Sequence, residues 1–173
     1  MKKNFIIVVA IVVVTAIFTL SVYKPVSLLI YRIREPLFNR PLSLALPKII
    51  VRNDGHGDGE FGSKRRNGRF HSGIDMLAPL GTPVYAAKSG MAFKGEVPTG
   101  YGKYVMIYHP DGYQTYYGHL SDWAFTAPKH VKQGELIGYT GNTGNAASKA
   151  IQPHLHFEIR KDGQPQNPHG LMK

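Results

Sequence analysis

From Phe61 onward the chain consists of short apolar runs separated by turns, and this alternation argues against a helical bundle. The sequence holds 19 Gly and 12 Pro among its 173 residues, and no segment after residue 60 carries a long helical period. Short apolar runs bounded by turn residues are typical of β-strands. The sequence therefore predicts one all-β domain over residues 60–173.

The strands of this domain can be placed by the turns between them. Pro110-Asp111-Gly112 separates two apolar runs, and this combination of turn residues is a strong hairpin signal. The strands that the sequence predicts span residues 82–87, 91–94, 103–109, 113–120, 131–139 and 154–160.

The N-terminus is long and apolar enough to cross a membrane. Lys2 and Lys3 precede an uncharged run over residues 4–23, whose 20 residues would span roughly the 30 Å hydrocarbon core as a helix. A cleaved signal peptide is the alternative, but its apolar stretch is usually about 7–15 residues and ends at an A-x-A-like site, which is missing here. We therefore expect residues 1–23 to form a retained membrane anchor.

Residues 24–59 are expected to form a flexible linker or stalk, because proline blocks helix interiors and central strands. The prolines of this segment are Pro25, Pro36, Pro41 and Pro47. Residues 54–60 read DGHGDGE, which suggests a calcium loop. Arg65 would then occupy the last loop position, where calcium needs a bidentate Glu, so calcium is not expected.

Charge and cysteine content exclude several classes of function. The absence of cysteine excludes disulfide scaffolds, iron–sulfur clusters, thiolate zinc sites and thiol nucleophiles. The net charge of +10 favours anionic surroundings such as acidic lipids, polyanionic wall polymers or nucleic acid. No nucleic-acid fold signature is visible, so nucleic acid is not an expected partner.

Four residues have the chemistry and spacing of a metal site. His71 and Asp75 lie four residues apart, and His154 and His156 lie two apart inside a predicted strand. Residues i and i+2 of a strand point to the same face, so both imidazoles would project into one space. Two imidazoles and one carboxylate would bind zinc and leave a position for water, whose pKa zinc lowers to about 7. The remaining imidazole would then act as a base or an acid.

His119 ends a predicted strand and is a second candidate for catalysis. On its own it would be interpreted as an ordinary surface or core residue. Beside a metal site, a second histidine suits amide hydrolysis, because one imidazole takes a proton while the other stabilises the oxyanion or protonates the leaving amine.

Taken together and in order, the motifs from residue 61 to residue 158 resemble the lysostaphin-type zinc metallopeptidases, which cut peptidoglycan peptides. The resemblance covers about residues 60–168. The matching stretches are RFHSGID at 69–75, GTPVYAA at 81–87, YGHLS at 117–121, VKQGELIG at 131–138, TGNTG at 140–144 and PHLHFE at 153–158.

The resemblance implies the fold and the role of each site residue. The family fold is a mostly antiparallel β-sheet domain of the duplicated hybrid motif kind. One zinc ion per chain would be held by His71, Asp75 and His156. His154 would serve as general base and His119 would stabilise the transition state.

The expected function is that of a membrane-anchored zinc metalloendopeptidase that hydrolyses peptide bonds in peptidoglycan cross-links or stem peptides. The domain is expected on the extracytoplasmic side, in the periplasm or cell wall, because its substrate is there. A non-catalytic module that binds peptidoglycan or activates a hydrolase is the alternative, although all five site positions are intact. A further alternative is latency, in which Asn39 or Asn53 of the linker fills the open zinc position. The bond cut and the oligomeric state stay open.

Overall fold

The computed structural model describes residues 2–42, 49–55, 57–65 and 68–173 and divides the chain into two compact units, Met1–Pro36 and Leu37–Lys173. Helix α1, Lys2–Arg34, forms the first unit, and none of its described side chains is buried. It is long and apolar enough to cross a membrane, which makes it a candidate span or signal. The predicted apolar run, residues 4–23, lies inside this helix.

The helix continues through Pro25, where the sequence predicted a linker to begin. Proline removes one backbone hydrogen bond and kinks a helix, but its φ near −65° is itself helical. Helices in membranes also tolerate proline because neighbouring groups satisfy the carbonyl that loses its hydrogen bond. The helical segment is therefore longer than the predicted anchor.

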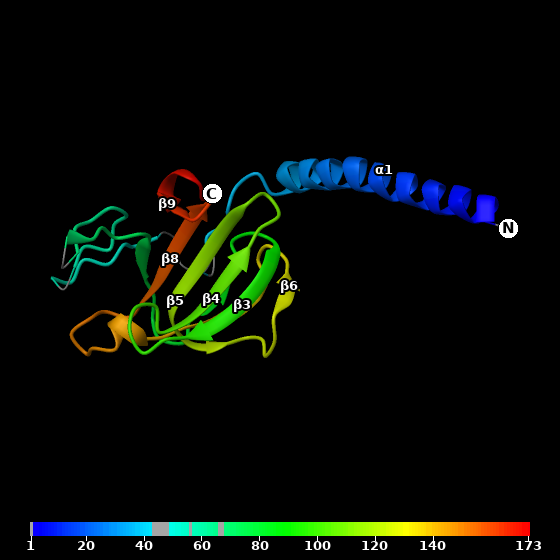
Figure 1. Ribbon diagram of the computed structural model, residues 1–173. Helices are drawn as coiled ribbons and strands as arrows, with labels where there is room; N and C mark the ends of the chain where they lie inside the picture. The colour runs from blue at the N-terminus through cyan, green and yellow to red at the C-terminus, as the bar shows by residue number, and fades with distance from the viewer. Residues whose placement is uncertain (1, 43–48, 56, 66–67) are drawn as a thin grey trace. The chain divides into compact units, whose positions relative to one another are not determined.

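Among the residues that the structure describes, the second unit is built on one sheet of nine strands, and the pairings between these strands are all antiparallel. The strand order is β1-β8-β5-β4-β3-β6; β7 pairs with both β2 and β5, and β9 pairs with β8. Figure 1 shows β8, β5, β4 and β3 side by side. The strands are β1 Ile74–Leu77, β2 Pro83–Tyr85, β3 Gly90–Glu96, β4 Lys103–Tyr108, β5 Tyr113–Trp123, β6 Lys129–Val131, β7 Leu136–Thr140, β8 His154–Lys161 and β9 Gln164–Gln166.

The predicted fold class, a mostly antiparallel β-sheet preceded by one apolar helix, is confirmed. The single strand predicted over residues 131–139 is instead divided into β6 and β7. Gly134 adopts a φ of +81°, and the backbone N–H of Glu135 donates to the carbonyl of Lys132. A left-handed glycine inside this tight turn ends one strand and starts the next. The short strands β1 and β9 were not predicted.

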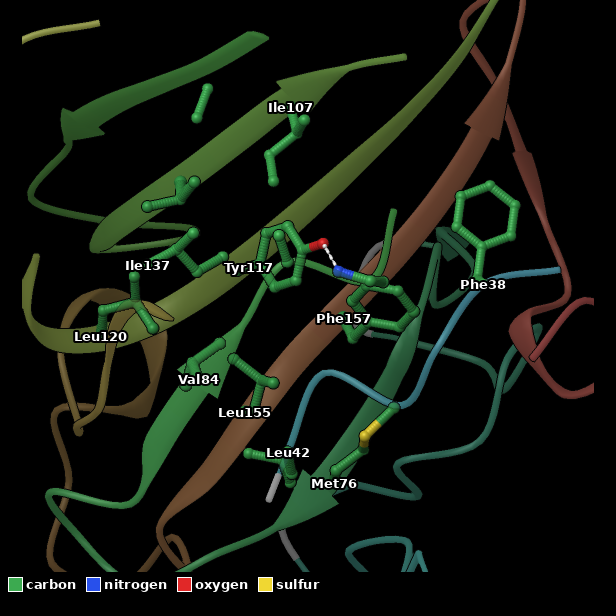
Figure 2. Close-up of a cluster of buried hydrophobic side chains, with 14 of the residues drawn as sticks. Phe38, Leu42, Met76, Val84, Ile107, Tyr117, Leu120, Ile137, Leu155 and Phe157 are labelled. Carbon is green, nitrogen blue, oxygen red and sulfur yellow. Dashed lines mark hydrogen bonds between the residues drawn. The ribbon is translucent and has the colours of Figure 1, made fainter. Parts of the chain in front are cut away.

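The core of the second unit is a cluster of buried hydrophobic side chains, most of which come from these strands (Figure 2). Tyr117 and Phe157 are opposite each other on β5 and β8, with ring centroids 5.3 Å apart. The buried Tyr117 hydroxyl accepts hydrogen bonds from the backbone N–H of Ala87 and the hydroxyl of Thr115. A buried polar group is stable only when paired in this way. The core thus fixes β5 and β8, the two strands that carry three of the candidate site histidines.

The structure departs from the predicted linker in the described residues between 37 and 59. Phe38 is 2% exposed and Leu42 is 7% exposed, and both belong to the core cluster. The backbone N–H of Phe38 donates to the carbonyl of Leu171. Burial of their apolar side chains stabilises these residues in the domain, although the prolines of the segment prevent it from forming regular helix or strand. Residues 43–48, which include Pro47, lie outside the described residues.

Phe38→Ala is predicted to destabilise the second unit strongly. The Phe38 ring contacts those of Tyr113 and His109 with centroids 5.4 and 5.6 Å away. Truncating a buried Phe costs about 3–5 kcal/mol of unfolding free energy, which urea unfolding would measure. Leu37→Ala, at a neighbouring residue that is 40% exposed, is the control and should change stability by less than about 0.5 kcal/mol. Equal effects of the two substitutions would contradict the placement of Phe38 in the core.

Candidate metal centre and active site

The strand register brings the predicted metal ligands together. Asp75 on β1 pairs directly with His156 on β8, and His156 pairs on its other side with Gly118 on β5. His71 lies four residues before Asp75, where the chain enters β1. Gly118 lies between His156 and Tyr101, since a Cβ added there would lie 3.4 Å from the Cβ of His156 and 3.3 Å from a ring carbon of Tyr101.

Three side-chain atoms converge in this place, one each from His71, Asp75 and His156. The Nε2 of His71 lies 3.0 Å from the Nδ1 of His156 and 3.1 Å from the Oδ1 of Asp75. The Nδ1 of His156 lies 2.8 Å from the same Asp75 oxygen. These three ligand atoms all lie within 4.8 Å of one another, as a single metal ion would need, and all three residues are buried.

The outer nitrogen of each ligand histidine is held by an acceptor. The Nδ1 of His71 lies 2.9 Å from the carbonyl oxygen of Glu60, and the Nε2 of His156 lies 2.9 Å from the Oε1 of Glu158. A nitrogen in such a contact carries the proton, so the inner nitrogen of the neutral ring keeps its lone pair. Acceptors of this kind fix the orientation of metal-binding histidines.

Asp75 lies in a strongly cationic environment. Its second oxygen, Oδ2, accepts hydrogen bonds from Arg52 at 3.0 Å and from Arg65 at 3.3 Å. Burial opposes ionisation of this carboxyl, but the close contacts of Oδ1 with His156 and His71 outweigh burial and hold the pKa of Asp75 far below its usual range. The carboxylate is therefore anionic, with Oδ1 directed at the histidines.

Glu158 organises a network behind His156. Its buried carboxylate accepts hydrogen bonds from Ser72, from Tyr101 at 2.8 Å and from Arg160 at 2.7 Å. Burial raises the pKa of Glu158, but His156 and then Ser72 and Arg160 lower it to about 2. Burial likewise lowers the pKa of His156, while the carboxylates of Asp75 and Glu158 raise it to about 9. An environment that favours a proton on His156 also favours a metal cation.

The donor set fits zinc. Ligand atoms about 2.0–2.1 Å from a tetrahedral zinc lie about 3.3 Å apart, and the three separations here are 2.8, 3.0 and 3.1 Å. Two imidazoles and one carboxylate, each with its outer atom held by a partner, are also the ligand types of catalytic zinc sites.

The two other predicted residues, His154 and His119, lie beside this group. Their ring centroids are 4.9 Å apart, and the His119 ring is 5.8 Å from that of His156. The Nδ1 of His154 lies 2.7 Å from the carbonyl oxygen of Gln152, and the Nδ1 of His119 lies 2.9 Å from that of Thr143. Each Nδ1–H therefore donates to the backbone, and each Nε2 is the nitrogen that can accept a proton.

His119 reaches the site through an unusual backbone conformation. On a regular strand it would point away from the face that Gly118 and His156 share. Its φ is +62°, a left-handed conformation that costs of order 1–3 kcal/mol outside glycine and is concentrated at functional sites. Burial and the neighbouring histidines His156 and His154 lower the pKa of His119 to about 3. Burial also lowers the pKa of His154, so both rings are neutral.

The structure therefore gathers all five predicted site residues, and it adds three that the sequence reasoning missed. Arg52, Arg65 and Glu158 contact the ligands directly. Glu158 follows His154 and His156 at the same two-residue spacing, so the strand pattern already placed it on their face. Arg52 had no comparable signal. The latency hypothesis names the side chains of Asn39 and Asn53, whose backbones pair with Ala87 and Asp58; these backbone contacts do not test it, and it stays a hypothesis.

Glu158→Gln is predicted to weaken metal binding. The amide keeps the shape of the carboxylate but removes the charge that holds His156 and Arg160. Loss of such an outer partner typically costs 10–100-fold in metal affinity, so we expect the zinc Kd to rise about 10–100-fold. Competition with a chromophoric chelator measures this change. Glu135→Gln, which alters an exposed ion pair with Lys129, is the control, and an equal zinc Kd in both variants would contradict the prediction.

The fold and the site together define a β-sheet domain with a His–Asp–His metal constellation and two further histidines beside it. The model of Peptidase family M23 matches residues 69–168, which is more than half of the chain. The chain therefore belongs to peptidase family M23, the lysostaphin-type family.

Several curated relatives of the chain carry the names of endopeptidases. The chain is 48% identical over 101 residues to the DD-carboxypeptidase/endopeptidase Mpg of Neisseria meningitidis, covering 58% of this chain and 22% of the relative. It is 40% identical over 100 residues to the peptidoglycan DD-endopeptidase ShyC of Vibrio cholerae, with the same coverage of 58% and 22%. The match thus spans about a fifth of the length of these relatives.

Solved structures agree with the fold. The catalytic domain of lysostaphin from Staphylococcus simulans superposes with a TM-score of 0.60 at 28% identity, covering 76% of this chain and 97% of that domain. A zinc-containing peptidase from Vibrio cholerae also has a TM-score of 0.60, at 30% identity, covering 76% of this chain and 39% of that protein.

Proposed function

We propose that this chain is a zinc metalloendopeptidase that hydrolyses peptide bonds in peptidoglycan cross-links or stem peptides. The observation that carries the proposal is the convergence of His71, Asp75 and His156 on one point, with His154 and His119 alongside. The relatives named as peptidoglycan endopeptidases support the choice of substrate.

In this proposal His71, Asp75 and His156 hold one zinc ion per chain. Zinc bound there would supply Lewis acidity and lower the pKa of a bound water to about 7. The anionic Asp75 and the lone pairs of the two histidines are the groups on this chain that bind it. Arg52 and Arg65 hold the second oxygen of Asp75 and leave Oδ1 to the metal.

His154 is the general base of the proposed reaction. Its Nδ1–H is held by the carbonyl of Gln152, so its Nε2 receives the proton of the attacking water. A buried, neutral ring is in the correct protonation state for this step. The same nitrogen can then pass the proton to the leaving amine.

His119 stabilises the negative charge that develops on the peptide carbonyl oxygen. Because its Nδ1–H donates to the carbonyl of Thr143, Nε2 can donate only when the ring holds a second proton. Burial and the neighbouring histidines lower the pKa of His119 before the reaction. A proton taken up from solvent would make Nε2 a donor, and the negative charge that develops on the nearby oxygen favours this doubly protonated ring. His119 is thus suited to the transition state rather than to the resting enzyme.

We further propose that helix α1 anchors the domain to the cell membrane and that the domain lies on the extracytoplasmic side, where peptidoglycan is found. The length and apolar character of α1 support the anchor. Envelope relatives support the location, including a lipoprotein NlpD/LppB homolog of Pseudomonas aeruginosa that is 39% identical over 111 residues.

The test is digestion of purified sacculi by the full chain in detergent, beside the His156→Ala variant, with mass spectrometry of the soluble products. The proposal predicts peptide fragments that the variant does not release, and the fragment masses identify the bond cut. Sacculus binding without release by the unaltered chain, across several wall chemotypes, would instead favour the non-catalytic binding or activating module.

A further inference from the structure

A short segment that precedes the family-matched region lies directly against the metal site. The backbone carbonyl of Ile50 accepts from Leu77, and the backbone N–H of Arg52 donates to the carbonyl of Asp75. Val51 forms an antiparallel bridge with Met76. These contacts extend the sheet by a few residues beyond β1 and deliver the Arg52 side chain, which is 5% exposed, to the site.

Arg52 contacts two carboxylates at once. Its Nη2 donates to the Oδ2 of Asp75 at 3.0 Å, and its Nη1 donates to the Oδ1 of Asp54 at 2.7 Å. The planar guanidinium fork allows both contacts in a fixed geometry. Arg65 also reaches the Oδ2 of Asp75, at 3.3 Å, but its side chain is 25% exposed. Arg52 is therefore the more buried of the two arginines that contact the Asp75 carboxylate.

Asp54 extends the contact to the catalytic histidine. Its Oδ2 accepts a hydrogen bond from the backbone N–H of Gln152 at 2.9 Å. The carbonyl of Gln152 in turn accepts from the Nδ1 of His154 at 2.7 Å. One continuous series of hydrogen bonds thus runs from Asp75 through Arg52, Asp54 and Gln152 to His154.

We propose that Arg52 and Asp54, together the Arg52–Asp54 bracket, are positioning residues that fix a metal ligand and the general base of the reaction from outside the family-matched region. The inference rests on the proposed function, because it assigns a role toward the zinc site and His154. Arg52 holds Asp75 so that Oδ1 faces the two ligand histidines. Asp54 holds the backbone that orients His154.

The two residues have separable consequences. Arg52 acts on a metal ligand, so its loss should weaken zinc binding. Asp54 acts on His154 through Gln152, so its loss should lower turnover while the ligands stay in place. A residue that only stabilised the fold would affect both quantities through unfolding and would show no such separation.

Arg52→Met in the full chain is expected to raise the zinc Kd about 10–100-fold, measured by competition with a chromophoric chelator. Arg52→Lys retains the charge but not the fork, since an ammonium is a point charge, and its Kd should lie between those of the unaltered chain and Arg52→Met. The visible absorption of Co²⁺ bound in place of zinc should change in both variants, because it reports ligand geometry. Lys129→Met, which breaks an exposed ion pair with Glu135, is the matched control and should leave the Kd unchanged.

Asp54→Ala is expected to keep the zinc Kd within about threefold and to lower kcat on a peptidoglycan peptide about 10-fold with little change in KM, as loss of an outer positioning partner does. Asp54→Asn, whose side-chain oxygen can still accept from Gln152, should recover most of the kcat. The Nδ1 proton of His154, identified by NMR through its absence in His154→Ala, should exchange with solvent faster in Asp54→Ala.

The role of Arg52 would be overturned if folded Arg52→Met had the same zinc Kd as the unaltered chain. If Arg52→Met does not fold, the same comparison is made with Arg52→Lys. Unchanged exchange of the His154 proton in Asp54→Ala would overturn the role of Asp54. Both measurements are independent of peptide cleavage, so they distinguish failure of the bracket from failure of the proposed peptidase activity.

Discussion

We expect the His156→Ala chain to lose both zinc and peptidoglycan cleavage. His156 supplies one of the three converging ligand atoms, and its Nδ1 lies within 3.0 Å of both other ligands. Loss of an outer partner alone costs about 10–100-fold, so loss of the ligand itself should weaken zinc binding by more than about 100-fold. Metal analysis of the purified variant and mass spectrometry of sacculus digests measure the two losses.

The control for this prediction is a histidine without a place in the site. His130 is exposed on strand β6, and His130→Ala should retain zinc and release the same fragments as the unaltered chain. His71→Ala and Asp75→Ala should behave like His156→Ala, because each removes one corner of the same triangle. Full zinc content with normal turnover in His156→Ala would contradict the metal assignment.

Local spacing in the sequence predicts only those features of the site that lie within one strand. His154 and His156 share a face because strand residues two apart do so, and the antiparallel strands follow from short apolar runs and turns. Local patterns do not contain the register between distant strands, so the pairing of Asp75 with His156 came only from the resemblance to the family and from the structure.

His119 shows a second limit of local patterns. Strict strand alternation predicts that a residue next to Gly118 points away from the face of His156. The left-handed backbone at His119 reverses this expectation, and histidine is among the non-glycine residues in which such a φ is enriched. Its position in the site could therefore be inferred from the family motif but not from the period of the strand.

The region before residue 60 shows how a correct local rule leads to an incorrect boundary. Proline disfavours helix interiors and central strands, and this rule predicts a linker here, although helix α1 continues through Pro25. Phe38 and Arg52 are nevertheless buried, because irregular chain can pack wherever distant partners supply burial and hydrogen bonds. The long-range contacts of Arg52 with Asp75 span 23 residues, a distance over which no periodic pattern gives information.

The largest effect that leaves the metal in place is expected from His154→Ala. The His154 ring approaches the site without joining the ligand triangle, since its Nε2 is 3.8 Å from the Oδ1 of Asp75. We therefore expect zinc content equal to that of the unaltered chain, measured by metal analysis. Turnover of a peptidoglycan peptide should fall about 10²–10⁴-fold, the usual contribution of a positioned general base.

His119→Ala separates the two histidines in the same assay. A group that stabilises the developing oxyanion contributes about 10²–10³ in kcat, so His119→Ala should be slow, as His154→Ala should be. Only His154→Ala should lose the base that takes the proton from water. The pH profile distinguishes them, because the ionisation of the base that limits the rate on the acidic side should vanish in His154→Ala and persist in His119→Ala. Loss of zinc from His154→Ala would instead show that His154 is a metal ligand. It could then not be the free base, the role for which the hydrogen bond from its Nδ1 to the carbonyl of Gln152 orients its ring.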